Sequence, residues 1–502
     1  MDIDGRNIEK RLAELEMSKN KRVGTWPERN PIIRGVASNS KEIRDDYIFF
    51  AINGCRGHGA NFTPDAIRRG ANLVVTDYDG HKILTKKKIN VPTILAENPR
   101  KTLATYSTKW YERQPQNQIA ITGTNGKTSV CHFVRQIWEL LGFKAANIGT
   151  LGVQGAIEMK LSNTTPEPVI LHKILRYLVD SEVQNVSMEA SSHGLSQFRL
   201  DGVNLKAAAF TNLTRDHLDY HKDEDDYFRA KCDLFERILP KGRVVVVNID
   251  DPYADLIKVV SRRRDHRLIT VGYKEGADIR IYDQRFYPGG QSISFSYMGL
   301  FKTIDLTLIG DFQATNILMA AALVIALGGK KNRVLDSLER LQSVPGRMHL
   351  VEHKEVNANV FVDYAHTPDA LAKALKALRL HTTGNLTVVF GAGGDRDIGK
   401  RSLMGAAAHE LADKVIVTDD NPRKESPFEI RKGILKECPN AEEIPDRAVA
   451  ILTAIKALRK GDVLLIAGKG HETGQIIGDD ILPFNDIEVA SMSISLLNGK
   501  NI

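Results

Sequence analysis

The segment Gln118-Ile-Ala-Ile-Thr-Gly-Thr-Asn-Gly-Lys-Thr-Ser129 decides the fold of this chain. Its first four residues predict a buried strand, and Gly123 to Thr128 predict a tight loop. Apolar side chains then recur at helical spacing, at Val130, Phe133, Val134, Ile137 and Leu141. A strand, a glycine loop and a helix in that order predict a phosphate cradle, because glycines let backbone N–H groups approach phosphate oxygens and the helix N-terminus adds a positive dipole end.

The loop also carries the side chains that a nucleotide needs. Lys127 supplies a charge for the β- and γ-phosphates, and the Thr128 hydroxyl is placed to hold Mg²⁺. The loop is shorter than the usual G-x-x-x-x-G-K-[ST], whose first glycine would fall at Ile121. The structural alternative is an ordinary strand-to-helix turn that contains Gly-Lys-Thr. The flanking strand and helix favour nucleotide binding.

Composition narrows the class of protein. A length of 502 residues predicts two to four domains, and 42% hydrophobic residues suit globular cores. The formal charge of +7 is modest, and the basic runs 86–88 and 262–264 lack interleaved aromatic residues, so we expect no nucleic-acid partner.

The cysteines and the apolar runs indicate the compartment. Four scattered cysteines form no CxxC pair, which favours a reducing environment over a disulfide framework or a zinc site. The N-terminus shows no basic-then-apolar signal, and the most apolar run, Ile317–Leu327, is too short to span a bilayer. We therefore expect a cytoplasmic protein without a membrane partner, and a monomer.

Strand and helix patterns alternate through most of the chain and predict an α/β protein of three domains. The polar stretch 114–118 and the stretch Ser343-Val-Pro-Gly-Arg347 suggest the boundaries. The expected domains are a smaller N-terminal α/β domain (1–113), a central P-loop nucleotide-binding domain with a parallel sheet (114–342) and a C-terminal Rossmann-like α/β domain (343–502).

Three polar or glycine-rich clusters follow strands in the last domain. They are Gly391-Ala-Gly-Gly394, Asp419-Asp-Asn-Pro-Arg423 and Gly468-Lys-Gly-His-Glu472. Ligands of open α/β sheets bind at the carboxyl ends of the strands, so three clusters on one edge predict a pocket.

Two further clusters follow strands of the central domain. Glu189 begins Glu189-Ala-Ser-Ser-His193, and a carboxylate is a natural ligand of Mg²⁺. His217 and His221 have i,i+4 spacing, which could suggest zinc, but no third ligand is in view. Taken alone, His217 fits a hydrogen-bonded structural histidine better.

With these motifs in order along nearly the whole chain, the sequence resembles the Mur ligases, ADP-forming amide ligases of peptidoglycan precursor synthesis. Within that family it is most similar to the UDP-N-acetylmuramoyl-tripeptide synthetases (MurE type). The family's phosphate loop has this same shortened form. The motifs that carry the resemblance are Thr122-Gly-Thr-Asn-Gly-Lys-Thr128, Asn163-Thr-Thr-Pro166, Glu189-Ala-Ser-Ser-His193, Asp216-His-Leu-Asp-Tyr-His221, Lys231-Cys-Asp-Leu-Phe235, Pro345-Gly-Arg-Met348, Asp363-Tyr-Ala-His-Thr-Pro368, Gly393-Gly-Asp-Arg396, Asp420-Asn-Pro-Arg423 and Gly468-Lys-Gly-His-Glu472.

The resemblance implies an ATP site and a magnesium site with a catalytic role. Lys231 matches the family's carboxylated lysine (N6-carboxylysine), whose carbamate bridges to the metal, and His217 would help to bind a second Mg²⁺. The implied catalytic residues are Lys127, Glu189, His217 and Lys231. The implied ATP-binding residues are Gly123, Thr124, Asn125, Gly126, Lys127, Thr128 and Ser129, and the metal-binding ones are Thr128, Glu189, His217 and carboxylated Lys231.

The resemblance also implies two substrate pockets. The Asp-Asn-Pro-Arg form is that of ligases that add meso-diaminopimelate, and Arg423 can pair with the carboxylate that lysine lacks. Diaminopimelate would be bound by Arg396, Asp420, Asn421, Pro422, Arg423, Gly468 and Glu472. The UDP-sugar peptide would be bound by Ser40, Asn163, Thr164, Thr165, Ser191, Gln197 and Arg199, although Asn163 and Gln197 could instead cap turns.

The first domain departs from the family pattern. The familiar Asp-Ser-Arg appears as Asn39-Ser40-Lys41, and Asp-Gly-His as His58-Gly59-Ala60. Gln313 stands where asparagine is common, in the segment that ends at Asn316. These changes could mark a paralogue with an altered substrate. The first-domain changes lie next to the implied uridine contacts, which are Ser38, Ser40, Cys55, Arg56 and Gly57.

We therefore expect an enzyme that uses ATP and Mg²⁺ to join meso-diaminopimelate to UDP-MurNAc-L-Ala-D-Glu through an acyl phosphate. One rival is a Mur-like paralogue, or a ligase with folylpolyglutamate-type chemistry, that joins another carboxylate and amine. A rival of another class is a P-loop NTPase that drives conformational change. ADP release that depends on a carboxylate substrate separates a ligase from that NTPase.

Overall fold

The structure is a computed structural model that describes residues 8–16, 20–26, 30–54, 57–214, 220–353 and 355–499. It divides into two compact units, 1–271 with 319–334 and 272–318 with 335–502. In the described part of the chain, no helix is long and apolar enough to cross a membrane.

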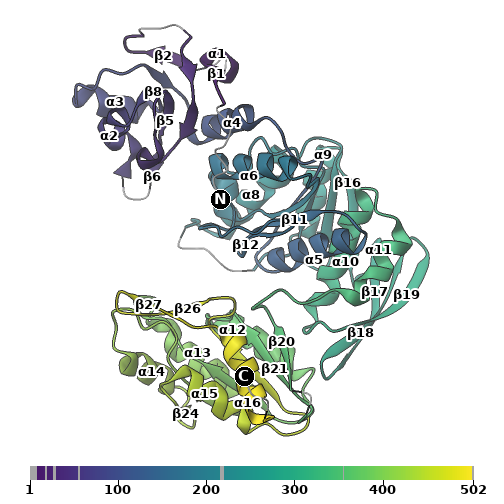
Figure 1. Ribbon diagram of the computed structural model, residues 1–502. Coiled ribbons are helices and arrows are strands. Elements are labelled where there is room, and N and C mark those ends of the chain that lie inside the picture. The colour runs from purple at the N-terminus through teal and green to yellow at the C-terminus, as the bar shows by residue number, and fades with distance from the viewer. Residues whose placement is uncertain are drawn as a thin grey trace. The chain divides into compact units, whose positions relative to one another are not determined.

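The first unit begins with a five-stranded sheet in the order β2-β9-β8-β5-β4, drawn in purple in Figure 1. Only β2 runs antiparallel to its neighbour. Apolar residues of α4, among them Leu103, Tyr106 and Trp110, pack on Ile48 and Phe50 of β5. The elements are β2 (Lys21–Val23), β4 (Gly35–Ala37), β5 (Tyr47–Ala51), α2 (Thr63–Arg68), β8 (Ala71–Thr76), α3 (Tyr78–Lys86), β9 (Thr93–Leu95) and α4 (Pro99–Tyr111).

The centre of the first unit is a mainly parallel sheet in the order β12-β11-β13-β10-β14-β15-β16. Its register places Ile121 beside Glu189 and Thr122 beside Phe210, so the loops after β10, β13 and β14 leave the sheet at one edge. The strands are β10 (Asn117–Thr122), β11 (Ala145–Gly149), β12 (Gly152–Gly155), β13 (Asn185–Glu189), β14 (Ala207–Phe210), β15 (Val244–Asn248) and β16 (Arg267–Gly272).

Helices cover both faces of this sheet, as the βα alternation predicts. Helix α5 buries Phe133, Val134 and Ile137 and packs against β10, β11 and β13. Residues of the other helices, such as Leu175 and Ile257, join one core cluster with alternate residues of the strands. The helices are α5 (Lys127–Leu140), α6 (Pro168–Asp180), α7 (Ser192–Ser196), α8 (Glu224–Asp233) with the π-helical turn Leu234–Ile238, and α9 (Ala254–Arg263).

The second unit contains an antiparallel meander that the alternating βα pattern did not predict. It consists of β17 (Ile279–Tyr287), β18 (Gly290–Tyr297) and β19 (Leu300–Leu306). A local signal is present in Gln291-Ser-Ile-Ser-Phe-Ser-Tyr297, where apolar and polar residues alternate as on a strand with one buried face. Helix α10 (Phe312–Ala326) confirms the core helix expected around Ile317–Leu327.

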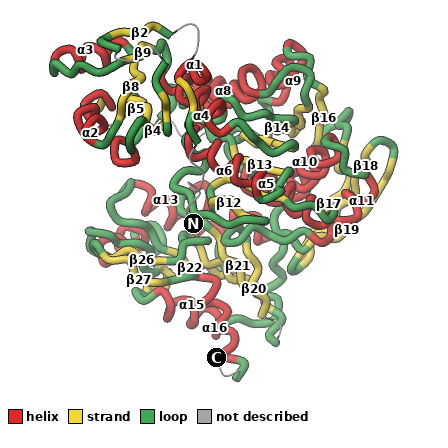
Figure 2. The backbone as a smooth tube through the Cα atoms, turned by 45° about the horizontal axis from the view of Figure 1, so that its top comes forward, coloured by secondary structure: helices red, strands yellow, loops and turns green. Residues whose placement is uncertain are grey.

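The second unit also holds a six-stranded, mainly parallel sheet in the order β20-β21-β25-β22-β23-β24. One core cluster joins it to α12, α13 and α14, and another joins it to α15 and α16 on the opposite face. Figure 2 shows α13 and α15 on opposite sides of the strands. The elements are β20 (His349–His353), β21 (Ala358–Asp363), α12 (Pro368–Arg379), β22 (Leu386–Phe390), α13 (Gly399–Leu411), β23 (Lys414–Val417), α14 (Pro427–Leu435), β24 (Glu442–Glu443), α15 (Arg447–Lys456), β25 (Val463–Ala467), the hairpin β26 (Gly474–Ile477) and β27 (Asp480–Pro483), and α16 (Asp486–Leu497).

Candidate functional site

The predicted phosphate loop lies between β10 and α5, and its backbone requires glycine at two positions. Gly123 has φ +146° and Gly126 has φ +85°, both in the region that favours glycine. A Cβ on Gly123 would lie 1.9 Å from Oγ1 of Thr211, so the loop passes directly over the end of β14. Because α5 begins at Lys127, its first N–H groups open onto this loop and can bind an anion.

Two lysines converge on the loop from different helices. Nζ of Lys127 donates to the carbonyl oxygens of Gly123 and Thr124 at 2.8 Å each, and Nζ of Lys231 donates to the same Gly123 oxygen at 2.8 Å. Lys231 is 1% exposed, and its Nζ lies 4.2 Å from the ring centroid of Tyr227. Two ammonium groups at one carbonyl create a strongly positive spot beside the loop, which suits the phosphates of ATP.

The predicted metal ligands Thr128 and Glu189 lie against each other. Oγ1 of Thr128 donates to Oε1 of Glu189 at 3.0 Å, and Thr150 donates to both oxygens of that carboxylate, from N at 2.9 Å and from Oγ1 at 3.2 Å. Glu189 is only 2% exposed. A hydroxyl and a carboxylate are hard oxygen donors, so this pair fits Mg²⁺.

The remaining predicted metal ligands are His217 and Lys231. His217 lies outside the described residues. Within the described ranges, no group of three or more His, Cys, Asp or Glu side chains could hold a metal. Of the predicted metal ligands, Thr128 and Glu189 contact each other, and Lys231 contacts the carbonyl of Gly123 in the phosphate loop.

Most of the predicted UDP-sugar-peptide residues form one hydrogen-bonded network next to Glu189. Oγ1 of Thr165 bonds to the Glu189 carbonyl at 2.8 Å and to Oγ of Ser191 at 3.0 Å. Arg199 donates to the Thr165 carbonyl and to Oε1 of Gln197, both at 2.8 Å. Arg199 is half-buried, and this burial lowers the pKa of its guanidinium from the ordinary high value.

The other predicted peptide contacts vary in position. Thr164 reaches the network through Oγ1 of Thr150 at 3.1 Å, whereas Asn163 is exposed. Ser40 is buried at the start of the 3₁₀ turn Ser40–Glu42, which follows β4. Its hydrogen bond to Asp65 lowers the pKa of that carboxyl. Cys55 and Arg56 lie outside the described residues.

The first-domain departures act as local caps in the structure. Oδ1 of Asn39 accepts from the Lys41 N–H at 3.1 Å, and Nδ1 of His58 accepts from the Ala60 N–H at 3.0 Å. Nε2 of His58 also lies 3.0 Å from Oδ1 of Asp77. These contacts give Asn39 and His58 structural roles.

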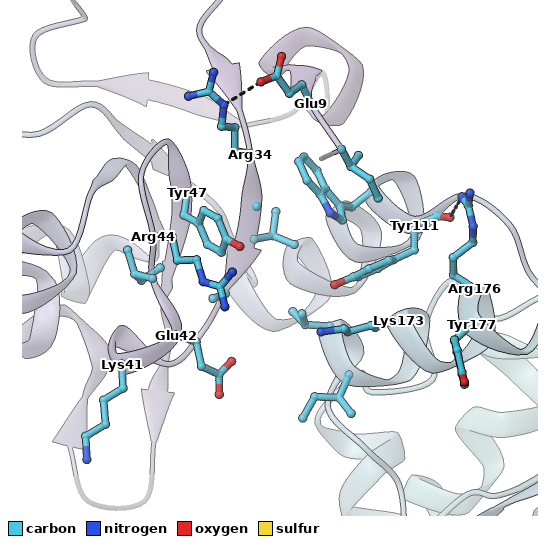
Figure 3. A pocket seen from close by; sticks show the side chains of 18 of the residues that line it. Glu9, Arg34, Lys41, Glu42, Arg44, Tyr47, Tyr111, Lys173, Arg176 and Tyr177 are labelled. Carbon is cyan, nitrogen blue, oxygen red and sulfur yellow. Dashed lines mark hydrogen bonds and ion pairs between the residues drawn. The ribbon is translucent and has the colours of Figure 1, made fainter. Parts of the chain in front are cut away.

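A cavity of about 970 Å³ lies beside β4, the last turn of α4 and α6 (Figure 3). Arg44, Tyr47 and Lys173 line it, and in Figure 3 their polar ends point toward its centre. Ser38, one residue beyond β4, donates to Oε2 of Glu167 at 3.2 Å, just before α6. Among the residues that the structure describes, no predicted substrate-binding residue lines this cavity.

The predicted diaminopimelate residues come together at the carboxyl edge of the sheet in the second unit. Nδ2 of Asn421 donates to Oε2 of Glu472 at 2.9 Å. Gly468 has φ +118°, and a Cβ on it would lie 2.5 Å from Oδ2 of the buried Asp420, so only glycine lets that carboxylate approach. Tyr364 lies among these residues. Its burial, and to a smaller extent the charge of Glu472, raise the pKa of its hydroxyl, whereas the charge of Arg396 lowers it.

Arg423 is held at this edge by both its backbone and its side chain. Its N–H donates to Ile476 O at 3.0 Å and its carbonyl accepts from Gly478 N at 2.7 Å, so the hairpin β26–β27 clamps the Asp-Asn-Pro-Arg segment. Its φ of +51° is rare for a residue with a side chain. NH1 donates to Gly394 O at 2.8 Å, which directs the guanidinium toward the loop after β22.

Several residues in these sites had no role predicted from the sequence. Thr150 contacts Glu189, and Tyr227 contacts Thr124 of the phosphate loop. Lys469 contacts both Asn421 and Glu472. The sequence could have indicated Lys469, because it stands between two glycines in the predicted pocket motif Gly468-Lys-Gly-His-Glu472. Thr150 and Tyr227 carried no such signal.

Comparisons with known proteins match both units. The Mur ligase middle domain matches residues 121–324, and the Mur ligase, glutamate ligase domain matches residues 346–470. A UDP-N-acetylmuramoyl-L-alanyl-D-glutamate--2,6-diaminopimelate ligase of Chelativorans sp. (strain BNC1) is 46% identical over 457 residues, 91% of this chain and 93% of that protein. The protein of the same name from Agrobacterium fabrum is 42% identical over 477 residues, 94% and 95% of the two chains.

Solved structures agree with these relatives. A structure of a UDP-N-acetylmuramoyl-L-alanyl-D-glutamate--2,6-diaminopimelate ligase is 30% identical, covers 98% of this chain and 100% of its own, and has a TM-score of 0.70. A folylpolyglutamate synthase of Mycobacterium tuberculosis solved with ADP and AMPPCP has a TM-score of 0.59 at 18% identity, covering 80% of this chain and 95% of its own, and so shares the fold alone.

Proposed function

Because this chain belongs to the Mur ligase family, we propose that it catalyses the ATP-dependent addition of meso-diaminopimelate to UDP-N-acetylmuramoyl-L-alanyl-D-glutamate in peptidoglycan precursor synthesis. It is an ADP-forming acid–amino-acid ligase. The observation that carries the substrate choice is the clamped Asp-Asn-Pro-Arg segment, which presents Arg423 beside Asn421 and Glu472 at one edge of the sheet.

The first half of the reaction uses the phosphate loop. The γ-carboxylate of the D-glutamate attacks the γ-phosphate of ATP, ADP leaves, and an acyl phosphate forms. The loop N–H groups, Lys127 and the N-terminus of α5 bind the phosphates and stabilise the charge that spreads over the transferring group. Mg²⁺, held by Thr128 and Glu189 with His217 and carboxylated Lys231, would neutralise phosphate charge when bound.

The carboxylate substrate would be held by the network next to Glu189. Arg199 is partly desolvated and fixed by Thr165 and Gln197, so its guanidinium is oriented before an anionic substrate arrives. Ser191 and Thr164 lie on the same network, and Asn163 and Ser40 would extend the contacts toward the sugar and the uridine.

The second half of the reaction needs an amine in the pocket of the second unit. The amine of diaminopimelate attacks the acyl phosphate, which gives the amide and phosphate. Arg423 would pair with the distal carboxylate, and Asp420 or Glu472 with the distal ammonium. Arg396, Pro422 and Gly468 would complete the pocket. Lysine lacks that carboxylate, so it would leave the guanidinium without its partner.

The proposal includes three domains, 1–113 for the UDP-sugar, 114–342 for ATP and 343–502 for the amino acid. The two family matches, 121–324 and 346–470, fall inside the second and third of these ranges and support them. We also propose a monomeric enzyme of the cytoplasm, where ATP is available and thiols such as buried Cys131 and Cys232 stay reduced.

The test is ADP release by the purified protein with UDP-MurNAc-L-Ala-D-Glu and a panel of amines: meso-diaminopimelate, L-lysine and L-ornithine. We expect ADP release only when the carboxylate substrate is present, and product of the expected mass mainly with diaminopimelate. ADP release that ignores the carboxylate would indicate the rival NTPase, and equal product with lysine would contradict the proposed substrate.

A further inference from the structure

A completely buried lysine stands between the two motifs of the amino-acid pocket. Lys469 has 0% exposure and lies in the turn after β25, between Gly468 and Gly470. Both glycines have positive φ, +118° and +54°, and a Cβ on Gly470 would lie 2.7 Å from Cβ of Tyr364. The glycines thus let the turn fold tightly and direct the lysine side chain inward.

The ammonium of Lys469 contacts one group from each motif. Nζ donates to Oδ1 of Asn421 at 3.0 Å and to Oε2 of Glu472 at 3.2 Å. A buried ammonium is costly unless it is paired and hydrogen-bonded, so a position that needed only packing would favour an apolar side chain. The nearby buried Arg447 is paired differently, because its Nε and NH2 donate to the two oxygens of the buried Asp486.

These contacts fix which way the Asn421 amide faces. Oδ1 accepts from Lys469 and from the Ile476 N–H at 2.9 Å, so Nδ2 must point to Oε2 of Glu472, where it donates at 2.9 Å. Both donors to the Glu472 carboxylate contact Oε2. Among the described residues, Oε1 is therefore the oxygen left for a ligand.

From this arrangement we propose that Lys469 is a positioning residue for the incoming diamino acid: it orients Asn421 and Glu472 so that Oε1 of Glu472 accepts the ammonium at the distal end of the substrate. The proposal rests on the proposed function and adds to it the residue that organises its amine pocket. Lys469 itself does not touch the substrate. Its effect is confined to the amine, because neither of its acceptors belongs to the phosphate loop.

The experiment compares wild type with Lys469→Met, which keeps the length of the side chain and removes its charge. We expect the KM for meso-diaminopimelate to rise at least about tenfold, while the KM for ATP and for UDP-MurNAc-L-Ala-D-Glu stays within about twofold. Trapping with hydroxylamine, which converts the acyl phosphate to a hydroxamate and releases phosphate, should proceed at the wild-type rate. Lys424→Met is the matched control, because Lys424 is exposed and pairs with Asp479 on the surface.

A double-mutant cycle separates positioning from a general effect on the fold. If Lys469 acts through Glu472, Lys469→Met should raise the KM for diaminopimelate much less in a Glu472→Gln background than in wild type. Additive effects would overturn the proposal. So would loss of hydroxamate formation in Lys469→Met, or loss of the folded state in both Lys469→Met and Lys469→Gln, since each would show that the lysine supports the whole unit. Wild type that makes hydroxamate but no amide with diaminopimelate would instead contradict the proposed function.

Discussion

Thr128 and Glu189, which are 61 positions apart, are joined by a hydrogen bond of 3.0 Å from the threonine hydroxyl to Oε1 of the carboxylate. The register of the central sheet explains the contact, because Ile121 of β10 lies beside Glu189 of β13. The phosphate loop and the carboxylate therefore leave the sheet side by side. A hydroxyl and a carboxylate, both of which are oxygen donors suited to Mg²⁺, therefore lie together beside the phosphate loop.

Replacement of Glu189 by glutamine should increase the Mg²⁺ requirement. Glutamine keeps the shape of the side chain and removes its charge, so we expect half-maximal activity to need about 100-fold more Mg²⁺. The measurement is ADP release as a function of Mg²⁺ concentration. Glu182→Gln is the control, because Glu182 is exposed and pairs with Lys144 on the surface. An unchanged Mg²⁺ dependence in Glu189→Gln would exclude this carboxylate as a ligand.

Replacement of Lys127 by alanine should abolish ligation and leave the fold intact. Its ammonium contacts the Gly123 and Thr124 carbonyls in the loop, so the variant should lose charge stabilisation of the phosphoryl group and at least about 100-fold in kcat. ADP release and thermal unfolding are measured together, with Lys144→Ala as control. A folded Lys127→Ala protein with full activity would refute the ATP site.

Lys231 should be essential, and its loss should be partly repaired by small carboxylates. If Lys231 forms a carbamate that holds Mg²⁺, Lys231→Ala should be inactive, and added formate or acetate should restore part of the activity. The exposed Lys222 provides the control variant. A carbamate also predicts a ¹³C signal from labelled bicarbonate in wild type that Lys231→Ala lacks. Normal activity in Lys231→Ala would rule out a Lys231 carbamate that holds Mg²⁺ for the reaction.

Arg423 should set the preference for diaminopimelate over lysine. Loss of a partner for a buried or half-buried charge costs several kcal/mol, so wild type should prefer diaminopimelate by about 100-fold or more. Arg423→Ala should raise the KM for diaminopimelate and narrow that preference, with the KM for ATP nearly unchanged. Lys424→Ala, next along the chain, is the control. An unaltered preference in Arg423→Ala would place the guanidinium outside the pocket.

Two buried histidines should make the first unit less stable in acid. Burial lowers the pKa of His172 to about 4 and that of His132 to about 3. Below about pH 6.5 the unfolded chain protonates both histidines, whereas the folded state keeps each of them neutral down to its lowered pKa. Their contribution is complete above pH 6.5 and is lost as the pH falls through the folded pKa. For His172 the full loss corresponds to about 3 kcal/mol.

Urea unfolding between pH 7 and pH 4 measures this effect. His172→Gln should flatten the pH dependence of the unfolding free energy relative to wild type, even though the variant loses the 3.1 Å contact of Nε2 with Oγ1 of Thr108. The exposed His409 provides the matched control, His409→Gln. A wild-type curve and a His172→Gln curve that remain parallel would exclude His172 as a source of acid sensitivity.

The sequence by itself determined those elements whose conformation depends on residues close together in the chain. Gly123 and Gly126 indicated the phosphate loop because only glycine adopts their backbone angles at low cost, and the spacing from Val130 onward predicted α5. The alternation of strands and helices predicted the parallel sheets, and the motif Asp420-Asn-Pro-Arg423 indicated the amino-acid pocket. The expectation of a continued βα rhythm failed at β17–β19, although the local alternation in Gln291–Tyr297 is that of a strand.

Only the tertiary structure decided which of these residues meet. Lys231 lies 108 positions from Gly123, and Lys469 lies 48 positions from Asn421, yet each pair is within hydrogen-bonding distance. Such contacts depend on strand order and register, which are set by how whole elements pack, and no short stretch of sequence encodes them. A lysine in a sequence shows a charge, and only the fold shows that Lys469 is completely buried and that its charge lies between Asn421 and Glu472.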